Sequence, residues 1–506
     1  MKSQSILKGM LRGLGVVLMV IGVTSIGRAQ FIGDALRLGQ FGDNVGARAL
    51  GMGGAYTGIA SDYSAIFWNP AGLAQLTHGE FFTGLSILSN GDNGTLSSSD
   101  LSGNTTSLGN ATSFTNNATN LNALGIVYPV PVRRGSLVVA FGFNRRDNFT
   151  AGTSFTGFNP NSSIIETLVP ATGTALPSDL ATNTPWYWQL GLVDSLNGKY
   201  REVFPFAGPG LTQRGTVTET GGLNDWSGAI AGEVSKNLYL GVTLTLVSGS
   251  YRFDNDYRES DNRHAYLFPY DLQELRVVQF VQDDITGFGA KFGVMYNIPD
   301  RFRLGIGIRT PTSYNVKENF GENISSLFYS TDANGNNFYG PVTTQDGSNS
   351  YDVHTPWVLS AGASVILSQL VLSGDIDYTD WTQLEFANAN TDLLQLNGDI
   401  KTTLRSTTNL RAGAEYEFLP VGLRLRGGFM YNPSPYQGDP STFGRKYFTA
   451  GLGFLISGSA MLDLAFAHGW WKTNSSNYQS VSSQYSSDVQ EDITTNTFLA
   501  TLVFRF

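Results

Sequence analysis

The chain has 506 residues, more than a typical domain, and only 14% of them are charged, whereas Gly (59), Tyr (22) and Phe (32) are abundant. The formal net charge of −9 disfavours nucleic acid as a partner, because phosphate binding needs a basic surface. The absence of cysteine excludes disulfides, thiolate metal sites and a lipid-modified N-terminal cysteine.

Residues 1–29 have the pattern of a secretory signal peptide. A basic start precedes the apolar run Leu14–Ile26, and Gly27-Arg28-Ala29 offers small residues at the two positions that a signal peptidase reads. No later stretch approaches the ~18 apolar residues that a membrane helix needs. The mature protein is therefore expected in the periplasm, outside the cell, or in the outer membrane as a β-barrel.

Residues 30–77 are rich in Gly and Ala and are predicted to form a plug. Asn69-Pro70 is a favourable helix start, because Asn caps free amides and Pro fits the first turn, which leaves Ala71–Leu76 as a short helix. Gly51, Gly53 and Gly54 permit the close backbone contacts that a plug inside a barrel needs.

Residues 78–506 read as paired strands with a two-residue period. In the last segment, Phe498, Ala500 and Leu502 lie on one strongly apolar face, and the chain ends on an aromatic residue. The mean hydropathy of −0.09 fits a transmembrane barrel, in which lipid-facing and lumen-facing residues average out. The predicted strands are Glu80–Leu88, Leu121–Val130, Ser136–Phe149, Trp226–Ser235, Leu238–Phe253, Asp284–Ile298, Phe302–Val316, Thr355–Leu367, Leu370–Asp380, Arg405–Phe418, Gly422–Asn432, Arg445–Ile456, Ala460–Trp471 and Ile493–Phe506.

Tight turns alternate strictly with long loops rich in Asn, Ser, Thr and Gly along these segments. Outer-membrane barrels have this asymmetry, with short periplasmic turns and long extracellular loops, whereas a soluble sandwich has no reason to sort its loops in this way. The sequence therefore predicts an all-β fold, a 14-stranded antiparallel barrel with both termini in the periplasm. A barrel of this size has a substantial lumen, so selectivity requires the plug inside it.

Several blocks of the sequence, in order, resemble the FadL/TodX (OMPP1) family of outer-membrane transporters for long-chain fatty acids and aromatic hydrocarbons. They begin with Gly46–Ala55 and Trp68–Leu73 in the plug and continue through Arg303–Pro311, Leu372–Trp381, Leu410–Tyr416, Arg424–Pro433 and Leu462–His468. The resemblance implies a 14-stranded barrel with an N-terminal hatch, located in the outer membrane. We also expect a monomer that needs no cofactor.

The resemblance further implies a route for the ligand. A hydrophobic molecule is captured near the extracellular loops, enters a pocket in the barrel, and leaves sideways into the outer-membrane lipid through an opening at a kink in the third strand. Here that strand would be Ser136–Phe149, with Gly142 as the expected bulge or kink. Asn69, Pro70 and Ala71 of the hatch would lie against it, either as a gate or as a purely structural helix cap.

Two groups of side chains are candidates for ligand contact. An inward Arg can pair with a bound carboxylate, although lumen charges more often pair with each other across the wall. In the long loop 150–225, an aromatic cluster could receive an apolar ligand, or it could simply form part of an aromatic girdle or the core of the loop. The inward charges are Arg303, Arg309, Asp375, Asp377, Arg411, Glu415, Arg424 and Arg426, of which Arg309, Arg424 and Arg426 are ligand candidates together with Trp186, Trp188, Phe204 and Phe206.

The sequence contains no convincing catalytic or metal-binding pattern. His78, His264, His354 and His468 are scattered without metal-ligand spacing, and Asp332–Asn336 lacks features of a calcium loop. The expected function is therefore passive transport of a fatty acid or hydrocarbon, and not catalysis. Two alternatives are a partner in protein secretion, with the loop 150–225 as docking surface, and a general porin, whose large conductance a hatch would block.

Overall fold

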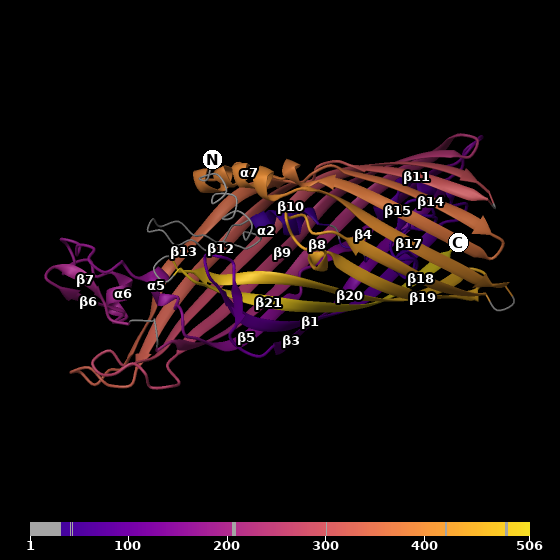
Figure 1. Cartoon of the computed structure of the whole chain (residues 1–506). Helices are drawn as coiled ribbons and strands as arrows, with labels where there is room; N and C mark the ends of the chain where they lie inside the picture. Colours follow the sequence, from indigo (N-terminus) through magenta and orange to yellow (C-terminus); the bar gives the residue numbers. More distant parts are fainter. Residues whose placement is uncertain are drawn as a thin grey trace, which may run out of the picture.

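The computed structural model describes residues 32–40, 42, 44–204, 209–299, 301–419, 422–480 and 484–506, so the predicted signal peptide 1–29 lies outside the described residues. These residues form a closed antiparallel barrel of 14 wall strands, and β1 pairs with β21 to close it (Figure 1). The wall strands are β1 (Glu80–Ser99), β3 (Thr112–Val130), β4 (Leu137–Asn148) continued by β5 (Ala151–Asn159), β8 (Leu211–Ser235), β9 (Leu238–Ser260), β10 (Leu272–Ile298), β11 (Phe302–Arg309) continued by β12 (Ser313–Phe328), β13 (Phe338–His354) continued by β14 (Val358–Leu367), β15 (Leu370–Asp380), β17 (Ser406–Phe418), β18 (Leu423–Asn432), β19 (Arg445–Ser457), β20 (Ala460–Gln479) and β21 (Ser486–Arg505).

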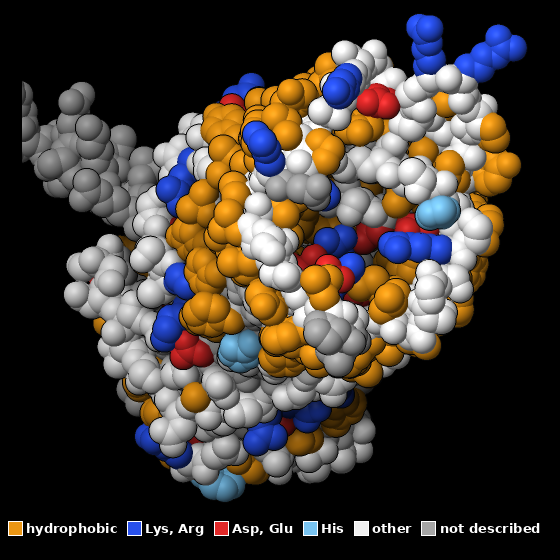
Figure 2. All heavy atoms as spheres, turned by 90° about the vertical axis from the view of Figure 1, so that its right-hand side faces the viewer, with side chains coloured by type: hydrophobic (Ala, Val, Ile, Leu, Met, Phe, Trp, Pro, Cys, Tyr) orange, Lys and Arg blue, Asp and Glu red, His pale blue; other side chains and the backbone are white. Residues whose placement is uncertain are grey.

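The alternation of side chains gives the wall an apolar outside and a polar inside. In β11, for example, Leu304, Ile306 and Ile308 are exposed, whereas the glycines between them are buried. Exposed apolar residues recur in this way around the barrel and form a belt that faces lipid. Figure 2 shows the result, with apolar side chains on the outer wall and charged ones gathered in the hollow. Among the described helices, none is long and apolar enough to cross a membrane.

The two ends of the barrel differ as predicted. Short turns such as Lys236-Asn237 and Ser368-Gln369 lie at the end where the C-terminus lies, and Asn237 and Ser368 take positive φ angles of 66° and 59° there. The long connections lie at the other end, which the asymmetry of such barrels makes extracellular. They include β2 (Thr105–Ser107), β16 (Glu385–Ala387), α7 (Thr391–Thr403) and the 3₁₀ helices η2 (Trp381–Gln383) and η4 (Ser441–Phe443).

Much of the sequence predicted as extracellular loop is strand. The predicted loop 317–354 contains most of β12 and all of β13, and β1 and β10 also extend beyond the predicted segments. Above the apolar belt neither face of a strand touches lipid, so polar residues occupy both faces and the hydrophobic alternation that marks a strand is lost.

The loop between β5 and β8 has structure of its own. It contains α5 (Ile165–Leu168), α6 (Trp186–Gln189) and the hairpin of β6 (Val193–Leu196) and β7 (Lys199–Glu202), which project beyond the strand ends in Figure 1. A buried apolar cluster that includes Ile165, Leu190 and Phe204 joins this loop to the extracellular ends of β9, β10 and β12.

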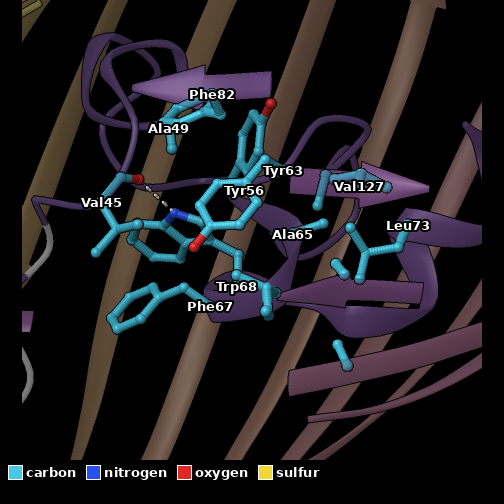
Figure 3. Packing of buried hydrophobic residues seen from close by; sticks show 14 of the residues in the cluster. Val45, Ala49, Tyr56, Tyr63, Ala65, Phe67, Trp68, Leu73, Phe82 and Val127 are labelled. Carbon is cyan, nitrogen blue, oxygen red and sulfur yellow. Dashed lines mark hydrogen bonds between the residues drawn. The ribbon is translucent and has the colours of Figure 1, made fainter. Parts of the chain in front are cut away.

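The described part of the segment before β1 lies inside the barrel as four short helices: α2 (Ile32–Gly39), α3 (Ala47–Gly51), α4 (Ala65–Trp68) and the 3₁₀ helix η1 (Pro70–Gln75). Their apolar side chains pack around Tyr56 and Trp68 (Figure 3), and the Trp68 indole N–H donates to the carbonyl oxygen of Val45 at 2.9 Å. Gly53 and Gly54 have φ angles of 63° and 67° where the hatch meets the wall. A Cβ at Gly53 would lie 2.7 Å from the Ala412 carbonyl oxygen, so the predicted need for glycine is confirmed.

Candidate functional site

A cavity of about 650 Å³ fills the lumen above the hatch. Phe67 and Trp68 of the hatch lie at its floor, and α2 contributes Leu36 and Arg37 to one side. The wall strands add the apolar side chains of Phe155, Tyr251, Phe253, Val277 and Phe280, and η2 adds Trp381. The cavity is therefore large enough and apolar enough for a hydrophobic ligand of small-molecule size.

Cationic side chains concentrate at the floor of this cavity. Lys291 of β10 and Arg309 of β11 are directly opposite each other in register, an arrangement of like charges that is unfavourable in itself. Arg411 of β17 is beside them, bound to Asp377, and its guanidinium carbon lies 5.7 Å from the Trp68 ring centroid. The Lys291 ammonium donates to the carbonyl oxygen of Phe67.

A second, small cavity of about 30 Å³ adjoins the floor and shares Phe67, Lys291 and Arg309 with the main one. Arg146 of β4 and Asp225 of β8 also line it, with 3.5 Å between guanidinium nitrogen and carboxylate oxygen. At the floor, around Phe67 and Trp68, the two cavities bring four cations (Arg146, Lys291, Arg309, Arg411) against two carboxylates (Asp225, Asp377), whereas the other carboxylates of the lining lie farther up the lumen beside Arg37, Arg445 and Lys472. Among the described residues, the positive charges at the floor therefore outnumber the negative ones.

The hatch, in contrast, is held to the wall by balanced charges. Arg48 of α3 forms two hydrogen bonds with the Glu415 carboxylate, at 2.8 and 3.0 Å. Arg426 donates to the same carboxylate at 2.6 Å and to Asp463 at 2.5 Å. The four groups lie below the cavity rather than in it, and they join the hatch to β17, β18 and β20.

Asn69, Pro70 and Ala71 lie against β9 and β10 of the wall. The Asn69 amide donates to the carbonyl oxygens of Thr57 (2.9 Å) and Val294 (3.2 Å), and its side-chain oxygen accepts from the Ala71 N–H. A Cβ at Gly241 would clash with Pro70. The element fits closely against the fifth and sixth wall strands, and η1, which begins at Pro70, also contacts β4 of the third strand.

The third wall strand is irregular, but not at Gly142. Gly142 pairs in regular register with Gly125 on one side and with Ser227 on the other. The predicted bulge lies instead at Arg146, between the pairs Arg145↔Asn224 and Asp147↔Leu223. Gly142 has another role, because a Cβ there would clash with the Tyr63 hydroxyl of the hatch. Its lack of a side chain is needed for hatch packing, which alternation alone does not reveal.

Of the predicted ligand arginines, the structure places one in the cavity. Arg309 lines both cavities, whereas Arg424 donates to Glu417 at 3.1 Å and Arg426 is buried in the hatch contact. All the charged residues predicted to face inward do lie on the lumen side of their strands. Their ion-pair partners come from the hatch and from other strands, so the sequence of one strand could not predict them. Lys291, which alternation also places inside, was missed, because its neighbours come from other strands.

The aromatic cluster forms the core of the extracellular loop. The ring of Trp186 lies 5.4 Å from that of Tyr187, and Trp188 lies 6.3 Å from Tyr200. Phe204 is buried against Tyr266. None of the three predicted aromatic residues that the structure describes lines the cavity, and Phe206 lies outside the described residues.

Comparison with known proteins gives consistent matches. The family model described as outer membrane protein transport protein (OMPP1/FadL/TodX) matches residues 212–506. A Pseudomonas aeruginosa FadL homologue is similar in structure, with a TM-score of 0.55 and 14% identity over 91% of this chain and 98% of that one.

Two toluene transporters are also similar in structure: TodX of P. putida (TM-score 0.48, 12% identity, 92% of this chain and 99% of that one) and TbuX of Ralstonia pickettii (0.45, 15%, 92% and 99%). At sequence identities this low, structural similarity shows only that the fold is shared. That conclusion rests on the FadL homologue, whose TM-score is above 0.5. No curated protein sequence matches the chain.

Proposed function

We propose, from the premise that the chain belongs to the FadL/TodX family of outer-membrane transport proteins, that its ligand is a long-chain fatty acid rather than a neutral hydrocarbon. The observation that carries this choice is the excess of cations over carboxylates at the floor of the cavity. The comparisons give no support to the alternative of a secretion partner, and we infer no catalytic role.

The cavity offers separate surroundings for the two parts of such a ligand. The alkyl chain would lie among apolar side chains such as Phe155, Phe253 and Val277, where it leaves water. The carboxylate would reach Lys291 and Arg309 at the floor, where charge-assisted hydrogen bonds are worth about 1.5–3 kcal/mol each. A neutral hydrocarbon would gain the first contribution and not the second.

Transport would be passive, with the hatch as the element that blocks water and ions. The hatch residue Tyr63 packs on Gly125 of β3 and Gly142 of β4, directly below the point where these two strands cease to pair. Displacement of the hatch would uncover this part of the wall. Asn69, Pro70 and Ala71 would act in gating by anchoring the hatch to β9 and β10, and Gly142 by receiving Tyr63.

The test is equilibrium binding of a long-chain fatty acid to the purified protein in detergent. A Lys291→Met, Arg309→Met double variant should weaken binding at least about tenfold, because each removed contact contributes on the order of 1.5 kcal/mol or more. Arg424→Met is the matched control, since Arg424 is inward but lies outside both cavities. Equal affinities for the double variant, the control and the unaltered protein would refute the proposal.

A further inference from the structure

The wall is interrupted where β3 and β4 part. Their ladder runs from Val130↔Leu137 to Ala123↔Asn144 and ends there, although both strands continue. Above this point β5 pairs with β8 and not with β3. Side chains of β3 still reach across: Asn116 donates to the carbonyl oxygens of Ala151 and Glu219, and the Phe114 ring lies against Gly152. We call this interruption of the wall the β3–β4 break.

Two bulges flank the break. Asn122 is the extra residue of β3 opposite β1, between the pairs Gly84↔Ala123 and Leu85↔Leu121. Arg146 is the extra residue of β4 opposite β8. Bulges end regular pairing and set the direction of a side chain, and they are common beside functional sites. Both bulge residues are polar and buried, with exposed fractions of 1% and 2%.

The break lies at the edge of the lipid-facing belt. Leu121 of β3 and Phe141 of β4 are exposed on the outer wall, 42% and 58% respectively, beside the last paired residues. A molecule that passed the break would therefore meet lipid. Two hydrogen-bond acceptors are available on the inner side of the break. Within the described residues, the side-chain oxygens of Asn122 and Asn144 have no hydrogen-bond partner.

The cavity floor is connected to the break by charged side chains. Lys291 and Arg309 line both cavities, and Arg146 and Asp225 line the small one together with them. Arg146 also donates to the Tyr314 hydroxyl, which fixes its guanidinium inside the lumen. An anionic group bound at the floor thus has a further cation next to it on the side of the break.

We propose that Arg146 is a specificity-determining residue that receives the carboxylate of the ligand from Lys291 and Arg309 at the β3–β4 break. The inference rests on the proposed function, in which the carboxylate is bound at the cavity floor. Arg146 makes the lateral passage faster for an acid than for a hydrocarbon of equal length. When the carboxylate has taken up a proton from solvent water, the side-chain oxygens of Asn122 and Asn144 accept a hydrogen bond from the neutral acid before it enters the lipid.

The experiment compares binding with uptake. The variant is Arg146→Met combined with Asp225→Asn, so that no buried carboxylate loses its partner. Arg146→Lys restores the charge, and Arg145→Met is the matched control, because Arg145 contacts Asn224 and Gly221 but lines neither cavity. We measure the Kd of a long-chain fatty acid in detergent, and the uptake of that acid and of the alkane of equal length by cells carrying each variant in the outer membrane.

We expect the double variant to keep its Kd within about twofold, because it removes one cation and one carboxylate and so leaves the charge excess and the Lys291–Arg309 pair at the floor intact. Acid uptake should fall about tenfold, since one charge-assisted contact on the way out is lost, and alkane uptake should stay unchanged. Arg146→Lys should recover most of the acid uptake. Equal loss of acid and alkane uptake would show a structural role for the bulge, and no loss would show no role; either overturns the inference with the proposed function intact. If the unaltered protein binds acid no better than alkane, the proposed function fails, and the inference fails with it.

Discussion

Two groups of charged side chains in the lumen differ in how completely they are balanced. Under the hatch, Arg48 and Arg426 are matched by Glu415 and Asp463 at distances of 2.5 to 3.0 Å. At the cavity floor, four cations face two carboxylates. Burying unbalanced charge is costly, so its presence beside an apolar cavity indicates a site that an anion completes. The balanced group holds the hatch in place.

The largest effect is expected from breaking the balanced group. Arg426→Met leaves Asp463 and part of Glu415 buried without their cation, which should lower the free energy of unfolding by about 3–5 kcal/mol. Arg424→Met removes a partly exposed pair with Glu417 and should cost no more than about 1 kcal/mol. Urea unfolding of the purified proteins in detergent measures both. If both variants lowered the free energy of unfolding by a similar amount, the ion pairs between hatch and wall would contribute no more to stability than the partly exposed pair.

A smaller effect is expected at the hatch anchor. Asn69→Ala leaves the carbonyl oxygens of Thr57 and Val294 without their donor, a change worth about 1–3 kcal/mol. The hatch should then be cleaved faster in limited proteolysis, and single-channel conductance should rise. Asn397→Ala is the control, because Asn397 makes two similar bonds to the Phe386 backbone on the extracellular side. Unchanged proteolysis in Asn69→Ala would argue against its anchoring role.

The extracellular loop provides a pH-dependent case. Glu259 is the penultimate residue of β9, well beyond the last exposed apolar residue of that strand, and burial raises the pKa of its carboxyl from the ordinary value of 4.5 to about 7. It accepts from Ser163 and from the Ile164 N–H and so holds the start of α5. The raised pKa reflects the cost of burying a charged carboxyl at this place, so the stability that comes from the neutral form is fully present below pH 4.5 and is lost as the pH rises through about 7.

Hydrogen exchange of α5, corrected for intrinsic rates, should therefore show several-fold less protection at pH 8 than at pH 5. Glu259→Gln removes the titrating group and should abolish the difference. A pH dependence that persists in Glu259→Gln would assign it to another group.

The smallest effect is expected in the aromatic cluster. Trp188 packs on Tyr200 within the loop and does not line the cavity, so Trp188→Ala should change the Kd of a fatty acid by less than about twofold, the usual size of distant surface effects. A tenfold weaker affinity of the Trp188→Ala variant in the same binding measurement would show that the aromatic cluster is part of the ligand-binding site.

The wall and its turns could be predicted from the sequence because they depend on local patterns. Alternation marks the part of each strand that crosses lipid, as in Leu304–Ile308, and turn residues such as Asn237 mark its end. The strands beyond the belt, such as β13, could not be predicted, since water on both faces removes the alternation.

The candidate site was only partly predictable. Arg309 was correctly placed in the lumen, but the difference between Arg309 and Arg426 depends on partners from the hatch and from other strands. The bulge at Arg146 arises from a one-residue mismatch with β8, which no pattern within β4 records. Such features follow from the register of pairs of strands and not from either strand alone.

Whether the cation excess at the cavity floor binds a carboxylate can be measured by comparing the affinities of a long-chain fatty acid and its methyl ester. Both have the same alkyl chain, and only the acid carries the charge. We expect at least about tenfold tighter binding of the acid to the unaltered protein, with the preference lost in the Lys291→Met, Arg309→Met variant. Equal affinity for acid and ester in the unaltered protein would contradict it.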